Sequence, residues 1–157
     1  MAAPCRLVPA ILSLFLCCTA LPVTAADTLS DSIPETPPGT AGAAIAIELN
    51  QTDTQAAACR MVFLATNALV ADIERLVLEV VLFDQAQRVA AMTLLDFQDL
   101  PAGRSRVRSF DLAGHDCQGF VRLLVNGVAE CAGAGLSVPR CERALAVSAR
   151  TALEVVQ

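Results

Sequence analysis

Hydrophobic and polar positions alternate with a period of two along most of the chain after residue 43. In residues 44–50, for example, Ile45, Ile47 and Leu49 alternate with Ala46 and Glu48. This alternation is typical of a β-strand with one buried face. Similar patterns predict further strands over residues 59–66, 76–83, 89–97, 104–112, 119–128 and 152–156.

The arginines of residues 104–112 complicate this pattern. Arg104, Arg106 and Arg108 occupy alternate positions, so that a strand would place their side chains on one face. Phe110 and Leu112 share the same parity. Because we expect the arginines to face solvent and the two apolar residues to face the core, the sequence predicts a bulge or strand end near Ser109.

The strand pattern indicates the fold class. About seven short strands separated by turns, with no long amphipathic helix, are typical of an antiparallel two-sheet β-sandwich. The pattern of residues 142–156 fits both a helix and a strand, and we expect a short helical turn over 143–149 before a final strand. The sequence therefore predicts one all-β domain over residues 44–157.

The N-terminal segment has the features of a secretory signal peptide. Residues 7–21 are almost wholly apolar and follow the basic Arg6, but the run is shorter than the roughly 20 residues that a membrane-spanning helix needs. Val23 and Ala25 provide the small residues of a signal-peptidase site. We therefore expect a signal peptide over residues 1–25 and export to the periplasm or the extracellular space.

Residues 26–43 are expected to form a flexible tether before the domain. This stretch contains three prolines and two glycines, which interrupt both helices and sheet ladders. The mature chain that remains after cleavage contains no further apolar run long enough to suggest a membrane span.

Composition narrows the classes of function. Hydrophobic residues make up 55% of the chain and charged residues 17%, which excludes an intrinsically disordered protein. The formal net charge of −5 argues against a nucleic-acid-binding protein, which needs a clustered basic surface. No pattern in the sequence calls for a cofactor or a metal ion.

Three motifs resemble a known group of modules. The run from Phe63 to Asn67, the segment 76–84 ending in Leu-Phe-Asp, and Leu-Pro-Ala-Gly at 100–103 followed by Phe110 resemble secreted immunoglobulin- or fibronectin-type bacterial modules. Overall the chain is also similar to small, uncharacterised exported proteins of alphaproteobacteria. The resemblance covers about residues 44–128. It implies an immunoglobulin-like sandwich and brings no catalytic residues with it.

Four cysteines remain after the signal peptide: Cys59, Cys117, Cys131 and Cys141. An even number in an exported chain predicts disulfides, with three pairings to choose from. In a sandwich of this topology the second and sixth strands face each other, which favours Cys59–Cys117 and leaves Cys131–Cys141. A metal site is disfavoured, because the chain has no Cys-x-x-Cys pair and only one histidine.

Two further groups of residues are candidates for a functional site. Cys117 near His115 has the residue types of an activated thiol, although a disulfide at Cys117 would remove the nucleophile. Arg104, Arg106 and Arg108 are candidates for an anion-binding or partner surface, or for charges that protect a sheet edge. Asp96 and Asp99 are expected to cap the backbone of a turn rather than to bind calcium.

The leading hypothesis for function is a non-enzymatic exported module that binds an unknown envelope protein or stabilises an envelope assembly. The alternative is a small envelope enzyme or thiol-redox protein that uses Cys117 with His115. The first follows from a sandwich scaffold without a recognisable catalytic motif, and the second from the one cysteine–histidine cluster.

The predicted cleavage gives a direct test of export. Signal-peptidase cleavage after Ala25 should produce a mature chain that begins at Ala26, and the second choice is a chain that begins at Asp27. Intact-mass spectrometry of protein recovered from the periplasm or the medium checks this. A chain that retains residues 7–21 would contradict the prediction.

Overall fold

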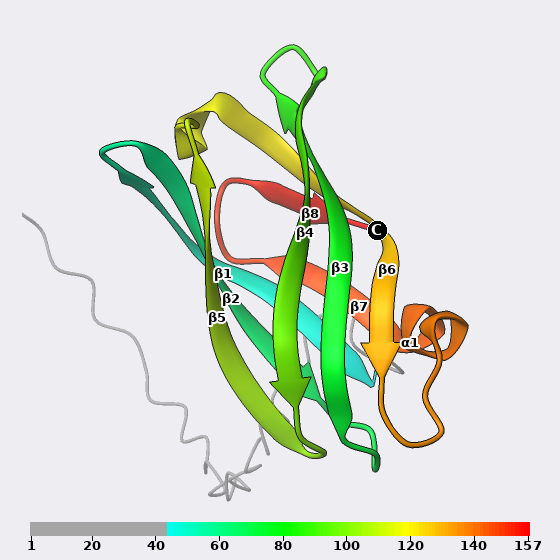
Figure 1. The fold of residues 1–157 in the computed structure, drawn as a ribbon. Coiled ribbons are helices and arrows are strands. Elements are labelled where there is room, and N and C mark those ends of the chain that lie inside the picture. Colours follow the sequence, from blue (N-terminus) through cyan, green and yellow to red (C-terminus); the bar gives the residue numbers. More distant parts are fainter. Residues whose placement is uncertain (1–43) are drawn as a thin grey trace, which may run out of the picture. The chain divides into compact units, whose positions relative to one another are not determined.

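The computed structural model describes residues 44–157, so the predicted signal peptide (1–25) and tether (26–43) lie outside the described residues. Within that range no helix is both long and apolar enough to cross a membrane. The elements are β1 (Ile45–Gln55), β2 (Ala58–Asn67), β3 (Ile73–Asp84), β4 (Val89–Leu100), β5 (Arg104–Ala113), the 3-10 helix η1 (Cys117–Gly119), β6 (Phe120–Ala132), α1 (Val138–Ala144), β7 (Leu145–Ala149) and β8 (Glu154–Val156) (Figure 1).

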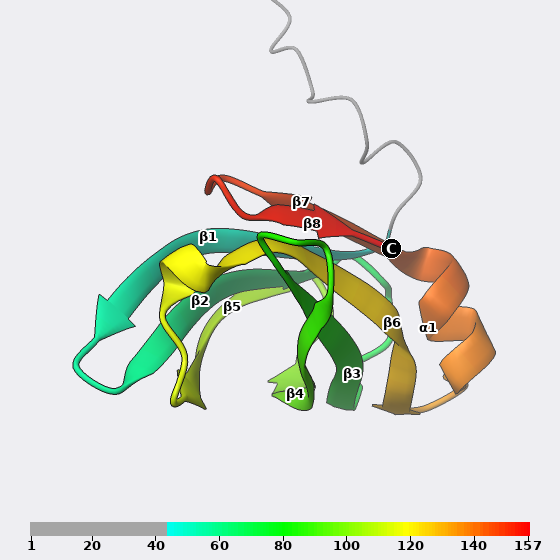
Figure 2. The same cartoon turned by 90° about the horizontal axis from the view of Figure 1, so that it is seen from above.

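The strands form two four-stranded sheets that pack against each other. The first has the order β5-β2-β1-β7 and the second the order β4-β3-β6-β8 (Figure 2). The predicted all-β sandwich is confirmed. The structure adds two details: residues 44–157 form eight strands where about seven were expected, and the β1–β7 and β6–β8 pairs are parallel while the other pairs are antiparallel.

The C-terminal segment accounts for both differences. The helical turn expected over 143–149 is wrong, because α1 is already ending there and Leu145 adopts an extended conformation (φ −80°, ψ 136°). Pro139 belongs to the first turn of α1, where a missing N–H costs no hydrogen bond. From Leu145 the chain adds one short edge strand to each sheet, β7 beside β1 and β8 beside β6.

Alternate side chains of the strands fill the space between the sheets. Along β2 every second residue is buried, namely Cys59, Met61, Phe63, Ala65 and Asn67. Along β3 the sequence predicts an inward set that alternates with Glu79, the one charged residue of 76–83, and the structure confirms it: Leu76, Leu78, Val80 and Leu82 are buried. β3 lies inside its sheet, and on its outer face Val77 and Val81 are only 5% and 6% exposed. Their direct neighbours on β4 and β6 are Asp96, Met92, Leu124 and Glu130.

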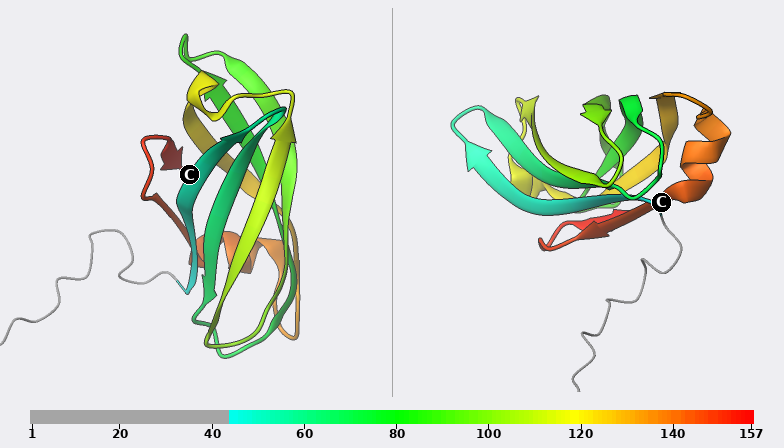
Figure 3. Two further views of the ribbon diagram at one scale, coloured as in Figure 1. Left: turned by 90° about the vertical axis from the view of Figure 1, so that its left-hand side faces the viewer. Right: turned by 90° about the horizontal axis from the view of Figure 1, so that it is seen from below.

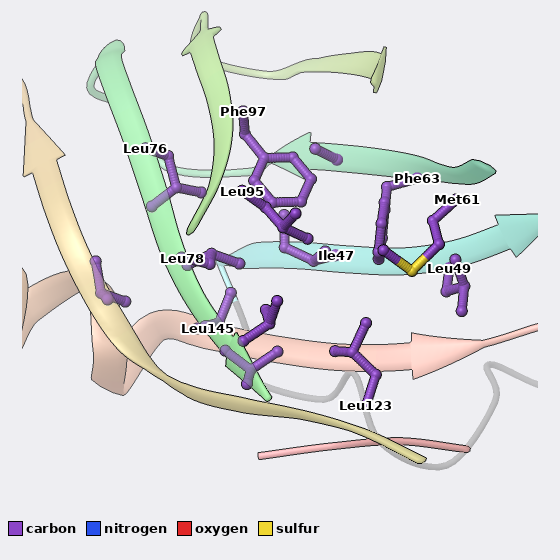
Figure 4. Close-up of a cluster of buried hydrophobic side chains, with 14 of the residues drawn as sticks. Ile47, Leu49, Met61, Phe63, Leu76, Leu78, Leu95, Phe97, Leu123 and Leu145 are labelled. Atoms are coloured by element: carbon purple, nitrogen blue, oxygen red, sulfur yellow. The ribbon is translucent and has the colours of Figure 1, made fainter. Parts of the chain in front are cut away.

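The core of the sandwich is mainly aliphatic, and Figure 4 shows Phe63 and Phe97 among these side chains. Phe110 completes an aromatic cluster near β4 and β5. Phe63 of β2, Phe97 of β4 and Phe110 of β5 meet edge to face, with ring centroids 5.2–5.9 Å apart. Pairs in this geometry contribute about 0.5–1.5 kcal/mol beyond the burial of their area. The cluster therefore joins the two sheets beside the turn between β4 and β5.

Two disulfides brace the domain. Cys59 of β2 is bonded to Cys117 of η1, with 4.7 Å between their Cα atoms, and this bond links the first sheet to the segment that leads into β6. Cys131 at the end of β6 is bonded to Cys141 of α1, with 6.5 Å between their Cα atoms. This is the pairing that the predicted topology favours.

The two bonds should contribute unequally to stability. They close loops of different length, with sequence separations of 58 and 10 residues. Loop-closure entropy then gives upper values of about 4 and about 3 kcal/mol. The double variant Cys59→Ser/Cys117→Ser should therefore lose more free energy of unfolding in urea than Cys131→Ser/Cys141→Ser. Equal losses, or the reverse order, would contradict this account.

Candidate functional site

The three arginines of β5 lie on the core side of their strand. β5 pairs with β2 in one unbroken register, in which Arg108 is opposite Phe63 and Arg106 is opposite Ala65. Directly opposed residues of an antiparallel pair share a face, and Phe63 and Ala65 face the core. The bulge expected near Ser109 is therefore wrong, and Arg104, Arg106 and Arg108 share their face with Phe110 and Leu112.

Arg108 bridges the edge strands of the two sheets. Its Nε donates to the carbonyl oxygen of Phe97 at 2.8 Å, and its Nη2 donates to the carbonyl oxygen of Asp99 at 3.2 Å and to the Asp99 carboxylate at 3.1 Å. The side chain is only 20% exposed. One guanidinium of the first sheet thus satisfies backbone acceptors on the free edge of β4, where the sandwich has no further strand.

The other two arginines of β5 form fewer polar contacts than Arg108. Arg106 lies 3.7 Å from the Asp99 carboxylate, while Arg104 is exposed and forms no ion pair within residues 44–157. Three other acids, Asp96, Asp111 and Glu130, pair with arginines outside β5. Asp111 accepts two hydrogen bonds from Arg60 that lower its pKa, and Arg75 lies between Asp96 and Glu130. The arginines therefore do not form one continuous exposed cationic surface.

A buried amide fixes the turn beside this bridge. Asn67 is fully buried at the end of β2, and its side-chain nitrogen donates to the carbonyl oxygens of Ala71 and Leu100 at 3.0 and 2.8 Å. Its side-chain oxygen accepts from the N–H of Leu69 at 2.9 Å. All these partners are backbone groups, so that Asn67 holds the β2–β3 connection against the end of β4.

Asp96 and Asp99 lie within β4 rather than in a turn. Asp96 accepts a hydrogen bond from the backbone N–H of Gln98, which lowers the pKa of Asp96, and Gln98 has a positive φ of 59° at an irregularity in the β3–β4 register. The expected capping of nearby backbone by Asp96 is therefore present. Residues 44–157 contain no cluster of three or more acidic, cysteine or histidine residues that could hold a metal ion.

Beyond the Arg108 bridge, β4 and β5 separate and leave a groove. From their shared turn the two strands diverge, as Figures 1 and 3 show. The groove has a volume of about 460 Å³ and is lined by residues 91–95 of β4, by 109–113 of β5, and by His115. Its floor includes the buried Leu95 and Leu112, and its walls are the free edges of two sheets.

The edge of β4 along this groove has no charged residue from Val89 to Leu95. On its outer face Met92 and Leu94 are 63% and 58% exposed. Alternation alone does not identify these two residues as exposed, because apolar residues occupy both parities of this strand and the pattern does not say which set is buried. The uncharged run itself was the available signal, since natural edge strands usually carry charges or proline.

His115 and Cys117 do not form a thiol site. Cys117 is bonded to Cys59, which is fully buried, and the imidazole of His115 packs against Phe120 with ring centroids 5.3 Å apart. Asp116 between them accepts from the N–H of Gln118 and the hydroxyl of Thr54, and both bonds lower its pKa. This cluster caps η1 and joins it to β1.

The Arg108 bridge predicts a loss of stability on substitution. Arg108→Gln removes one part-buried and two exposed hydrogen bonds from a charged donor, and we expect a loss of about 1–3 kcal/mol in the free energy of unfolding. The matched control Arg104→Gln should change it by less than about 0.5 kcal/mol. Urea unfolding of both variants checks this, and equal effects would refute the bridging role.

Comparison with known proteins assigns no family to the chain. No protein-family model, no curated protein and no solved structure matches it. The resemblance to immunoglobulin-type modules of exported bacterial proteins therefore stays a prediction. Function has to be argued from the edge strands, the groove and the disulfides of the domain itself.

Proposed function

We propose that this chain is an exported, non-enzymatic binding module, and that its partner docks as an extended strand along β4 on the open side between β4 and β5. The single observation that carries the proposal is the uncharged free edge of β4 beside the groove. Through this contact the module would bind a partner or stabilise an envelope assembly.

The backbone chemistry of an edge strand supports this assignment. Within residues 44–157 β4 pairs only with β3, so that the N–H and C=O groups along its other edge have no strand to bond. Such an edge readily accepts another strand, since main-chain hydrogen bonds give affinity and alternate side chains give specificity. Arg108 occupies the edge only at Phe97 and Asp99, which leaves the stretch from Val89 to Leu95 for a partner.

Export is supported by the covalent structure. All four cysteines of the described domain are paired in disulfides. Disulfides persist in oxidising compartments such as the periplasm and the extracellular space. Together with the predicted signal peptide over residues 1–25, they favour an exported protein.

Photo-crosslinking in intact cells tests the proposed surface. A photoreactive phenylalanine analogue at Leu94, on the outer face of β4, should give a discrete adduct with a partner polypeptide. The same analogue at Val107 on β5, which is 63% exposed and outside the groove, is the matched control and should give none. No adduct from position 94, or the same adducts from both positions, would reject the surface.

A further inference from the structure

We infer that the strand which docks on β4 is β4 of a second copy of this chain, in antiparallel orientation about a two-fold axis at Thr93. This inference rests on the proposed function and names its partner. The two copies would join their β4-β3-β6-β8 sheets into one continuous sheet.

The side chains of β4 are self-complementary about this axis. Residues 91–96 pair with β3 without a bulge, so that their alternation is regular, with Met92 and Leu94 outward and Thr93 and Leu95 inward. An axis at Thr93 places Met92 of each copy opposite Leu94 of the other, because opposed residues of an antiparallel pair share a face. The two-fold axis therefore creates two equivalent contacts, in each of which Met92 of one copy and Leu94 of the other shield each other from solvent.

The neighbouring registers fit less well. An axis at Met92 would place Leu94 opposite Ala90, where the β3–β4 register is irregular. An axis at Leu94 would place Met92 opposite the Asp96 carboxylate and Ala91 opposite Phe97, whose carbonyl oxygen already accepts from Arg108. Registers displaced by a single residue would oppose inward and outward side chains. With the axis at Thr93, the apolar pairs Met92–Leu94 and Ala91–Leu95 lie within the regular stretch of β4, between the irregularity at Ala90 and the Arg108 contact at Phe97.

Charge and packing favour a second copy as the occupant. The chain has a net charge of −5, yet the paired segment has no charge before Asp96, which would lie opposite Ala90 and already pairs with Arg75. Met92 lies beside Val81 of β3, and Val81 lies beside Leu124 of β6. The apolar row Leu124–Val81–Met92 would therefore continue into Leu94 of the second copy.

The oligomeric state of the exported, disulfide-bonded protein tests this inference. Light scattering coupled to size exclusion, over a range of concentrations, should show a dimer. Met92→Lys should raise the dimer dissociation constant by about tenfold or more, which is about 1.4 kcal/mol. The matched control Val107→Lys, at a position equally exposed in the isolated chain, should leave the constant within about threefold.

A charge pair tests the register itself. In the double variant Met92→Lys/Leu94→Glu, each lysine would lie opposite the glutamate of the other copy, so that dimerisation should recover from the Met92→Lys level. With an axis at Met92, lysine would oppose lysine and recovery would not occur. Circular dichroism and urea unfolding of each variant verify that the monomer remains folded.

The outcomes separate this inference from the proposed function. A wild-type protein that stays monomeric at high concentration, equal weakening by Val107→Lys, or failure of the double variant to recover would overturn the inference. If position 94 then crosslinks to a different polypeptide, the proposed function stands without self-pairing. A monomer without any adduct from position 94 would remove both.

Discussion

The unbroken register between β2 and β5 is the constraint on which the open side of this sandwich depends. It places Arg106 and Arg108 on the core face of an edge strand, where a charged head group must find partners. Arg108 finds them in the carbonyl oxygens of Phe97 and Asp99, on the edge of the opposite sheet. Within residues 44–157 no strand spans the open side between β4 and β5, and the Arg108 side chain closes one end of it.

The same arrangement explains why the other end stays open. Because an arginine side chain has a limited length, the Arg108 bridge contacts only the end of β4 next to the turn. It leaves Val89–Leu95 free. Phe110 and Leu112 follow on β5: Phe110 packs edge to face against Phe97 of β4, and Leu112 is buried in the core. The groove lies between β4 and β5 beyond the Arg108 bridge, where the two strands diverge.

The two disulfides constrain this domain in a way that suits the proposed binding role. Cys59–Cys117 ties the two sheets at the end of the domain where β5 leads into η1, and Cys131–Cys141 holds α1 on β6. A small core of aliphatic and phenylalanine side chains supplies the remaining cohesion. Edge strands can then offer backbone groups to a partner without rearrangement, which lowers the entropic cost of binding.

The sequence by itself determined the strand pattern, the inward residues of β2 and β3, and the cysteines available for pairing, because a period of two and a buried face are local properties of the chain. It did not determine that residues 145–149 form β7, since a short segment takes its state from the strand it meets, here β1. Nor did it determine the direction of the arginines of β5 or of Met92 and Leu94. Which face of an edge strand is buried depends on its register with the neighbouring strand, and only the tertiary structure decided that register.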